Sequence, residues 1–169
     1  MRGRWRFDSV ADYLKAAPKR LDDARELLEA PTWRADREDA LHRHLRAAVY
    51  LAGYGVECAL KAYIISRVPG ARSFEEAVTR RRADGEADLH FTGRRAHDLR
   101  ALRRATDLDP VLDRTETIRK AWARCQKWDP DWRYDPDHFT SRREARLFVD
   151  AAAALHAAIE VARTSEQEG

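Results

Sequence analysis

The sequence has few of the residues that build disulfide scaffolds, metal sites and β-rich folds. Its two cysteines, Cys58 and Cys125, are too few for a disulfide framework, and they lack the spacing of a metal-binding pair. Seven glycines and six prolines are few for the many turns of a β-sandwich or barrel. No apolar run approaches the roughly 18 residues of a membrane span, and the first residues lack a signal peptide's apolar stretch. We therefore expect a soluble protein of the reducing cytoplasm.

The charge balance is close to neutral and the apolar content is ordinary. The chain has 32 Lys and Arg against 29 Asp and Glu, a net charge of +3, which alone does not indicate a nucleic-acid partner. Apolar residues make up 44% of the 169 residues, so the chain can bury a core. We expect a single domain over residues 1–169, with a helical core over 8–164 and short flexible termini.

Helical patterns cover most of the chain, and no strand pattern competes with them. The strongest lies over residues 36–67, where apolar side chains recur at spacings of three and four and predict one long helix. These residues are Leu41, Leu45, Ala48, Ala52, Val56, Ala59 and Tyr63. Helix-start and helix-stop signals predict the other helices, over 9–30, after Ser73, near Ala96, over 109–125 and over 141–163. The predicted fold is an all-α, up-and-down bundle of about five helices.

The predicted long helix carries a second stripe, formed by Tyr50, Tyr54, Glu57 and Lys61. Glu57 and Lys61 stand four residues apart in the order that favours an ion pair on one helix. Because Glu57 stands inside an apolar run, its carboxylate is either paired or functional. The alternative is an ordinary amphipathic helix whose outer face the pair stabilises. Gly53 and Gly55 disfavour a helix, so we expect another backbone to pass close to them.

Three segments carry a resemblance to a known family. They are the run Tyr50-Leu-Ala-Gly-Tyr-Gly-Val-Glu-Cys-Ala-Leu-Lys-Ala-Tyr63 and the triplets His97-Asp98-Leu99 and Trp132-Arg133-Tyr134. Together they resemble the HEPN superfamily of small bacterial helical domains, over about residues 40–161. The resemblance implies a dimerising bundle of about five helices. It further implies a metal-independent endoribonuclease of a toxin–antitoxin or phage-defence module, with a nucleotidyltransferase encoded alongside as a partner.

The ribonucleases of this family share an Arg that is followed, after four to six residues, by a His. Arg133 and His138 have this spacing late in the chain, and Arg37 and His42 have it near the start of the long helix. The resemblance favours the later pair as catalytic. The His would move a proton while the ribose 2′-hydroxyl attacks the phosphate, and the Arg would stabilise charge on the phosphate oxygens. The alternative is that Arg133 and Tyr134 only attach the loop to the bundle.

The second hypothesis is a non-catalytic module that binds a nucleotide or a partner nucleotidyltransferase. We expect Glu57, Lys61 and His97 to line a central groove, where groups of opposite charge could bind a phosphate or a base. The predicted substrate-binding residues are therefore Glu57, Lys61, His97 and Tyr134. For His97 the alternative is a hydrogen-bonded histidine beside Asp98, which would cap a short helix.

The remaining motifs give weaker signals. Four aspartates lack the glycine and distal glutamate of a calcium loop, so neither a metal nor a cofactor is predicted from Asp129, Asp131, Asp135 and Asp137. Three arginine runs are either solvated surface or a face that binds RNA phosphates, namely 80–82, 94–95 and 103–104. Two tryptophans are either core residues or stacking platforms for bases, namely Trp128 and Trp132. The expected partners are RNA or a nucleotide and a second copy of the chain, and no membrane.

Overall fold

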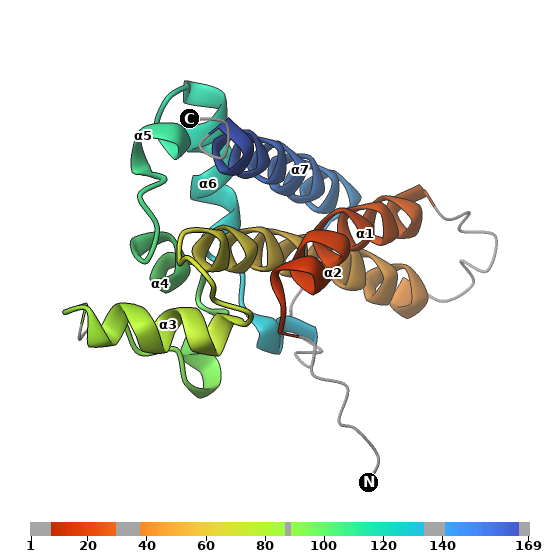
Figure 1. Cartoon of the computed structure of the whole chain (residues 1–169). Helices are drawn as coiled ribbons and strands as arrows, with labels where there is room; N and C mark the ends of the chain where they lie inside the picture. Colours follow the sequence, from red (N-terminus) through yellow and green to blue (C-terminus); the bar gives the residue numbers. More distant parts are fainter. Residues whose placement is uncertain (1–7, 30–37, 87–88, 134–140, 166–169) are drawn as a thin grey trace, which may run out of the picture.

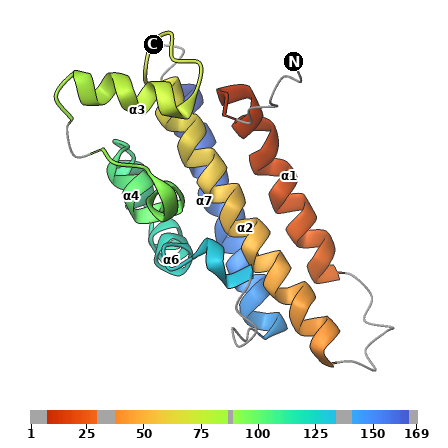
Figure 2. The ribbon, with the colours of Figure 1, turned by 90° about the horizontal axis from the view of Figure 1, so that it is seen from below.

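The computed structural model describes residues 8–29, 38–86, 89–133 and 141–165. Over these ranges the chain forms seven α-helices and two short 3-10 segments, with no strand, so the all-α bundle is confirmed. Three long helices lie side by side (Figures 1 and 2), namely α1 (Val10–Glu29), α2 (Glu38–Ser66) and α7 (Arg142–Ser165). Four shorter helices follow one another along one flank of α2 and α7, namely α3 (Phe74–Ala83), α4 (Leu99–Arg104), α5 (Asp109–Leu112) and α6 (Glu116–Cys125).

Helix α2 is the centre of the bundle. It packs against α1, α3, α4, α7 and the 3-10 segment η2 (Pro130–Arg133), and between Ala52 and Ile65 every residue except Tyr54 is buried. The segment Arg43–Ser66 has the length and hydropathy of a membrane-crossing helix, but 83% of its most apolar stretch is buried inside the bundle. It belongs to the long helix that the sequence predicted over 36–67, and Glu57 and Lys61 interrupt its apolar run.

The two glycines of α2 allow close approach of neighbouring groups. A Cβ on Gly53 would lie 2.1 Å from Cδ1 of Trp128, and a Cβ on Gly55 would lie 3.1 Å from the backbone oxygen of Ala17. The expected close backbone is therefore confirmed at Gly55. At Gly53 the expectation was wrong, because the neighbour is the indole ring of Trp128.

Helix boundaries follow local caps that the sequence pattern identified only in part. The hydroxyls of Ser73 and Ser141 accept hydrogen bonds from the backbone of Glu76 and Glu144, as predicted. The helix expected near Ala96 begins at Leu99 instead, because Asp98 accepts the first backbone N–H groups of α4. Before it, residues 93–97 form the 3-10 segment η1 (Gly93–His97).

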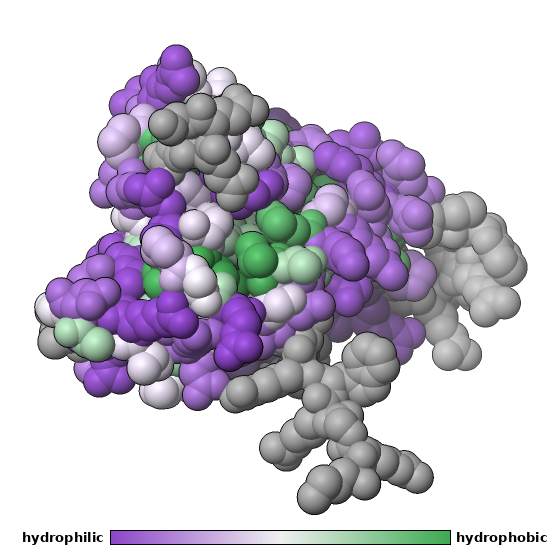
Figure 3. Space-filling model, in the orientation of Figure 1, coloured by the Kyte–Doolittle hydropathy of each residue, from purple (hydrophilic) through white to green (hydrophobic). Residues whose placement is uncertain are grey.

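One other expectation needs correction. The helix expected over 109–125 is two helices, because the hydroxyl of Thr115 accepts from the Ile118 backbone N–H and begins α6. Helix α3 continues to Ala83, and α1 is one helix with Pro18 inside it. On the face seen in Figure 3, hydrophobic surface lies over α2, between hydrophilic surface of α1 and α3.

Candidate functional site

Three of the predicted binding residues meet at one point beside α2. Glu57 is 1% exposed and Lys61 is 6% exposed, and the Lys61 Nζ donates to the Glu57 Oε1 at 2.5 Å. The His97 Nδ1 lies 3.0 Å from Glu57 Oε1 and 3.1 Å from Oε2. These three residues, the Glu57 triad, confirm that the carboxylate inside the apolar run is paired.

The hydrogen bonds of the Glu57 triad determine which nitrogen of His97 carries the proton. An ionised carboxylate only accepts hydrogen bonds, and Glu57 already accepts one from the ammonium of Lys61. The Nδ1 of His97 therefore donates to Glu57. When the imidazole is neutral, its Nε2 has a free lone pair and is the nitrogen that a ligand can use.

Two neighbouring elements hold the triad in place. Glu57 and Lys61 stand one turn apart on α2, while His97 ends η1 and comes directly before the capping residue of α4. The buried side chains of Leu99 and Leu102 pack α4 into the core. The position of His97 is therefore determined by the packing of α4 against α2.

The exposed part of His97 lines a cleft of about 350 Å³, which we call the His97 cleft. One wall is formed by residues 94–100 of η1 and α4, and the other by residues 126–130 after α6. Four cations line it, and no described carboxylate forms an ion pair with three of them, Arg95, Arg100 and Lys127. Because 43% of the His97 side chain is exposed, the imidazole is accessible to a ligand in this cationic cleft.

One ion pair connects the two walls of the cleft. Arg94 of the first wall hydrogen-bonds to Asp129 of the second and also lies 3.6 Å from Asp131. Partial burial raises the pKa of Asp129, but the backbone N–H of Asp131 and the guanidinium of Arg94 outweigh this effect and leave that pKa below its usual value. The carboxylate of Asp129 is therefore already paired, and the other three cations outnumber the remaining carboxylate of the lining, that of Asp98.

Trp128 is part of the hydrophobic core, and Trp132 packs against it. Trp128 is 5% exposed and its ring covers Gly53, with the Tyr50 ring centroid 5.9 Å away. Trp132 packs edge-on against Phe148 at 6.4 Å. Among the two readings of these residues, the packing therefore favours the core over a stacking platform for bases.

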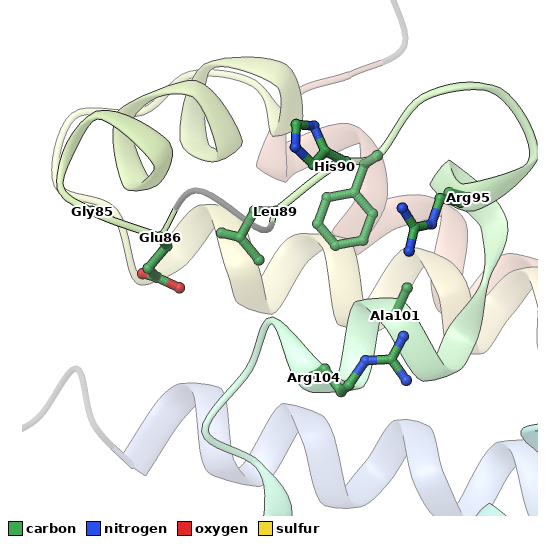
Figure 4. Close-up of a pocket in the computed structure, with 8 residues that line it drawn as sticks. Gly85, Glu86, Leu89, His90, Arg95, Ala101 and Arg104 are labelled. Carbon is green, nitrogen blue, oxygen red and sulfur yellow. The ribbon is translucent and has the colours of Figure 1, made fainter.

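One further cavity adjoins the Glu57 triad, and another adjoins the His97 cleft. Lys61 also lines a cavity of about 440 Å³, where its ammonium lies 5.7 Å from the Tyr13 ring centroid and 5.2 Å from that of Phe74. Arg95 is shared between the His97 cleft and a cavity of about 560 Å³. In that cavity the guanidinium groups of Arg95 and Arg104 lie on either side of Ala101 (Figure 4).

The predicted catalytic pairs lie mostly outside the described residues. His138, Tyr134 and Arg37 are not among the described residues, nor are the side chains of Arg133 and His42. The backbone of Arg133 ends η2, and η2 begins at Pro130, which lines the His97 cleft. The described structure thus brings together three of the four predicted binding residues and leaves the catalytic pair a prediction.

The described residues include two buried cysteines and no cluster of three metal-binding side chains. Both cysteines are buried, and this burial raises the pKa of the Cys58 and Cys125 thiols to about 12, so neither is a thiolate near neutral pH. Within 8–29, 38–86, 89–133 and 141–165, no three metal-binding side chains come together. Asp135 and Asp137 of the aspartate-rich segment lie outside these ranges.

Sequence reasoning missed Arg100 and Lys127 as lining residues of the cleft. Only the tertiary fold brings them together, because they belong to α4 and to the turn after α6 and no periodicity relates the two. Arg94 and Arg95 had a signal, as a basic run. No family model, curated protein or solved structure matches the chain.

Proposed function

We propose that the chain is a HEPN-like, metal-independent endoribonuclease of a toxin–antitoxin or phage-defence module, and that its RNA lies in the His97 cleft. The observation that carries this proposal is the buried Glu57–Lys61 pair, which holds His97 at the edge of a cation-lined cleft. The segment that leads to Arg133 borders the same cleft. The three motifs of the HEPN resemblance support the choice of reaction.

The lining of the cleft suits an RNA backbone. Arg95, Arg100 and Lys127 supply positive charge without a paired carboxylate among the described residues, and such cations bind phosphates in a salt-dependent way. A guanidinium can donate two parallel hydrogen bonds to one phosphate. The volume of about 350 Å³ is in the range of small-ligand sites, so one nucleotide of the strand can occupy the cleft.

In this proposal the catalytic pair is Arg133 and His138. Arg133 stabilises the charge that develops on the phosphate oxygens, and His138 transfers a proton during the attack of the 2′-hydroxyl. The products are a 2′,3′-cyclic phosphate and a 5′-hydroxyl. A second copy of the chain completes the assembly, and light scattering should give twice the mass of one chain.

An RNA cleavage assay in EDTA tests this function. The purified chain should cut RNA and leave 2′,3′-cyclic phosphate ends, and His138→Ala should abolish cutting without changing the melting temperature. His44→Ala, which removes an exposed histidine of α2, is the matched control and should cut normally. Full activity in His138→Ala would exclude this pair, and loss in Arg37→Ala alone would assign the earlier one.

The cavity of about 440 Å³ that Lys61 lines favours a second candidate. This candidate is a non-catalytic module that binds a nucleotide or a partner nucleotidyltransferase. The ammonium and aromatic walls of the cavity, formed by Lys61, Tyr13 and Phe74, can receive a phosphate and a base. Calorimetry with AMP and ATP should then show binding that Arg82→Ala weakens, since Arg82 lines this cavity. Arg119→Ala, on the exposed face of α6, should bind normally. No heat with either nucleotide contradicts nucleotide binding.

A further inference from the structure

We propose that His97 is a second catalytic histidine, whose Nε2 accepts the proton of the 2′-hydroxyl that attacks the scissile phosphate. This inference rests on the proposed ribonuclease function and adds the group that activates the nucleophile. It follows from the geometry of the Glu57 triad and from the charge of the cleft that His97 lines.

The Glu57 triad has the arrangement that a proton-accepting histidine needs. A carboxylate that binds Nδ1–H holds the imidazole in one tautomer and one orientation, and it stabilises the imidazolium that forms. Both Glu57 oxygens lie within 3.1 Å of the His97 Nδ1, and Lys61 holds the same carboxylate. Glu57 and Lys61 are thus positioning residues, and the Nε2 is left for the substrate.

The surroundings of His97 supply positive charge that could bind a phosphate. Arg95 and Arg100 flank His97 in the first wall, and Lys127 lies in the second. The carboxylate of Asp98, which also lines the cleft, already accepts two backbone N–H groups of α4. A phosphodiester bound by the three cations would bring its neighbouring ribose to the imidazole.

The step balances with the two histidines in complementary roles. The 2′-hydroxyl gives its proton to the Nε2 of His97, and its oxygen forms a bond to phosphorus. The bond from phosphorus to the 5′-oxygen breaks, and this oxygen takes a proton from the imidazolium of His138. His97 ends protonated and His138 neutral, and exchange of protons with water restores both.

The competing explanation is that His97 only fastens η1 to α2. The variant His97→Asn separates the two roles, because the asparagine amide can donate to Glu57 from near the Nδ1 position but has no basic nitrogen in place of Nε2. A fastening role predicts wild-type activity in His97→Asn. A proton-accepting role predicts that kcat falls at least about a hundredfold while KM and the melting temperature stay near wild-type values.

The decisive experiment compares two RNA substrates in the full chain. One carries the natural 5′-oxygen leaving group, and the other carries sulfur there, which departs without protonation. The sulfur substrate should restore His138→Ala, which lacks the proton donor, and should leave His97→Asn slow. Rescue of His97→Asn, or full activity of His97→Asn on the natural RNA, overturns the role of His97 and leaves the ribonuclease function intact.

Two controls make the result unambiguous. His44→Asn changes an exposed histidine outside the cleft and should cut both substrates normally. If His97→Asn does not fold, Glu57→Gln replaces it, since the amide keeps the shape of Glu57 but cannot stabilise an imidazolium. Its kcat should fall with KM unchanged, and unchanged kcat overturns the proposal. Absence of cleavage by the wild-type chain overturns both the ribonuclease function and this inference.

Discussion

The two walls of the His97 cleft are attached to the bundle by different forces. The first wall is held by a buried charge as well as by the packing of α4, because His97 binds the carboxylate of Glu57. The second wall is held by apolar packing, because the ring of Trp128 covers Gly53. Both attachments use the same helix, α2.

This difference has consequences for specificity and stability. A buried ion pair contributes little net stability, but removal of one partner leaves an uncompensated charge inside the protein. An aromatic ring packed on a glycine is stabilised by its buried area and is sensitive to any added volume. The first wall should therefore be sensitive to changes in charge, and the second to changes in size.

The largest effect is expected for Glu57→Ala, which removes the charge that holds the first wall. Lys61 would keep a buried ammonium without its carboxylate, and we expect the free energy of unfolding to fall by about 3–5 kcal/mol. Urea denaturation measures this change. The double variant Glu57→Leu with Lys61→Met removes both charges and should lose clearly less stability. An equal loss in the double variant would contradict the role of charge.

A smaller effect is expected for Gly53→Ala, which adds volume under the second wall. The new Cβ would lie 2.1 Å from the Trp128 Cδ1, so the ring must move, and we expect a loss of about 1–3 kcal/mol. Tryptophan fluorescence should report the displacement. Gly55→Ala should lose less stability, because the nearest contacts of its Cβ would be 3.1 Å away. Equal stability of Gly53→Ala and wild type would show that the second wall tolerates added volume.

Arg94→Ala should have almost no effect on stability, although it breaks the ion pair between the walls. Its side chain is 69% exposed, and exposed ion pairs contribute little because water screens them. The midpoint of urea unfolding should match that of Lys120→Ala, which breaks the exposed pair with Glu116. A larger shift in Arg94→Ala alone would show that the connection between the walls is a structural support.

A pH-dependent effect is expected from a histidine outside the cleft. Burial lowers the pKa of His156, and the nearby Arg25 of α1 lowers it as well, while Glu160 and Asp22 oppose the shift. Because the unfolded chain binds this proton more readily, stability is complete above about pH 6.5 and decreases as the pH falls below it. His156→Gln should reduce this decrease in urea titrations between pH 8 and pH 5. An unchanged pH profile would show that protonation of His156 is not the source of the decrease.

The contacts near in sequence were predictable and the distant ones were not. The pair of Glu57 and Lys61 follows from a four-residue spacing on a helix, and the Ser73 and Ser141 caps follow from local motifs. By contrast, the contact of Trp128 with Gly53 joins residues 75 positions apart, and no periodic pattern reports such a distance. A glycine in a helix only showed that something approaches closely.

In the candidate site, too, the residues could be predicted from local motifs, but their distant contacts could not. His97 was singled out through the triplet that it begins, but its bond to Glu57 spans 40 residues and required the fold. The break between α5 and α6 was missed for a related reason. Thr115 suits a helix interior or a helix start, and only the course of the chain decides between them.

The residues of α2 that support the two walls of the cleft, Gly53 and Glu57, stand about one helical turn apart. Four residues of α-helix correspond to about 6 Å of rise, so a single rigid turn sets the spacing between the supports of the two walls. A residue inserted between positions 53 and 57 would therefore rotate one support by about 100° relative to the other and misalign the two walls.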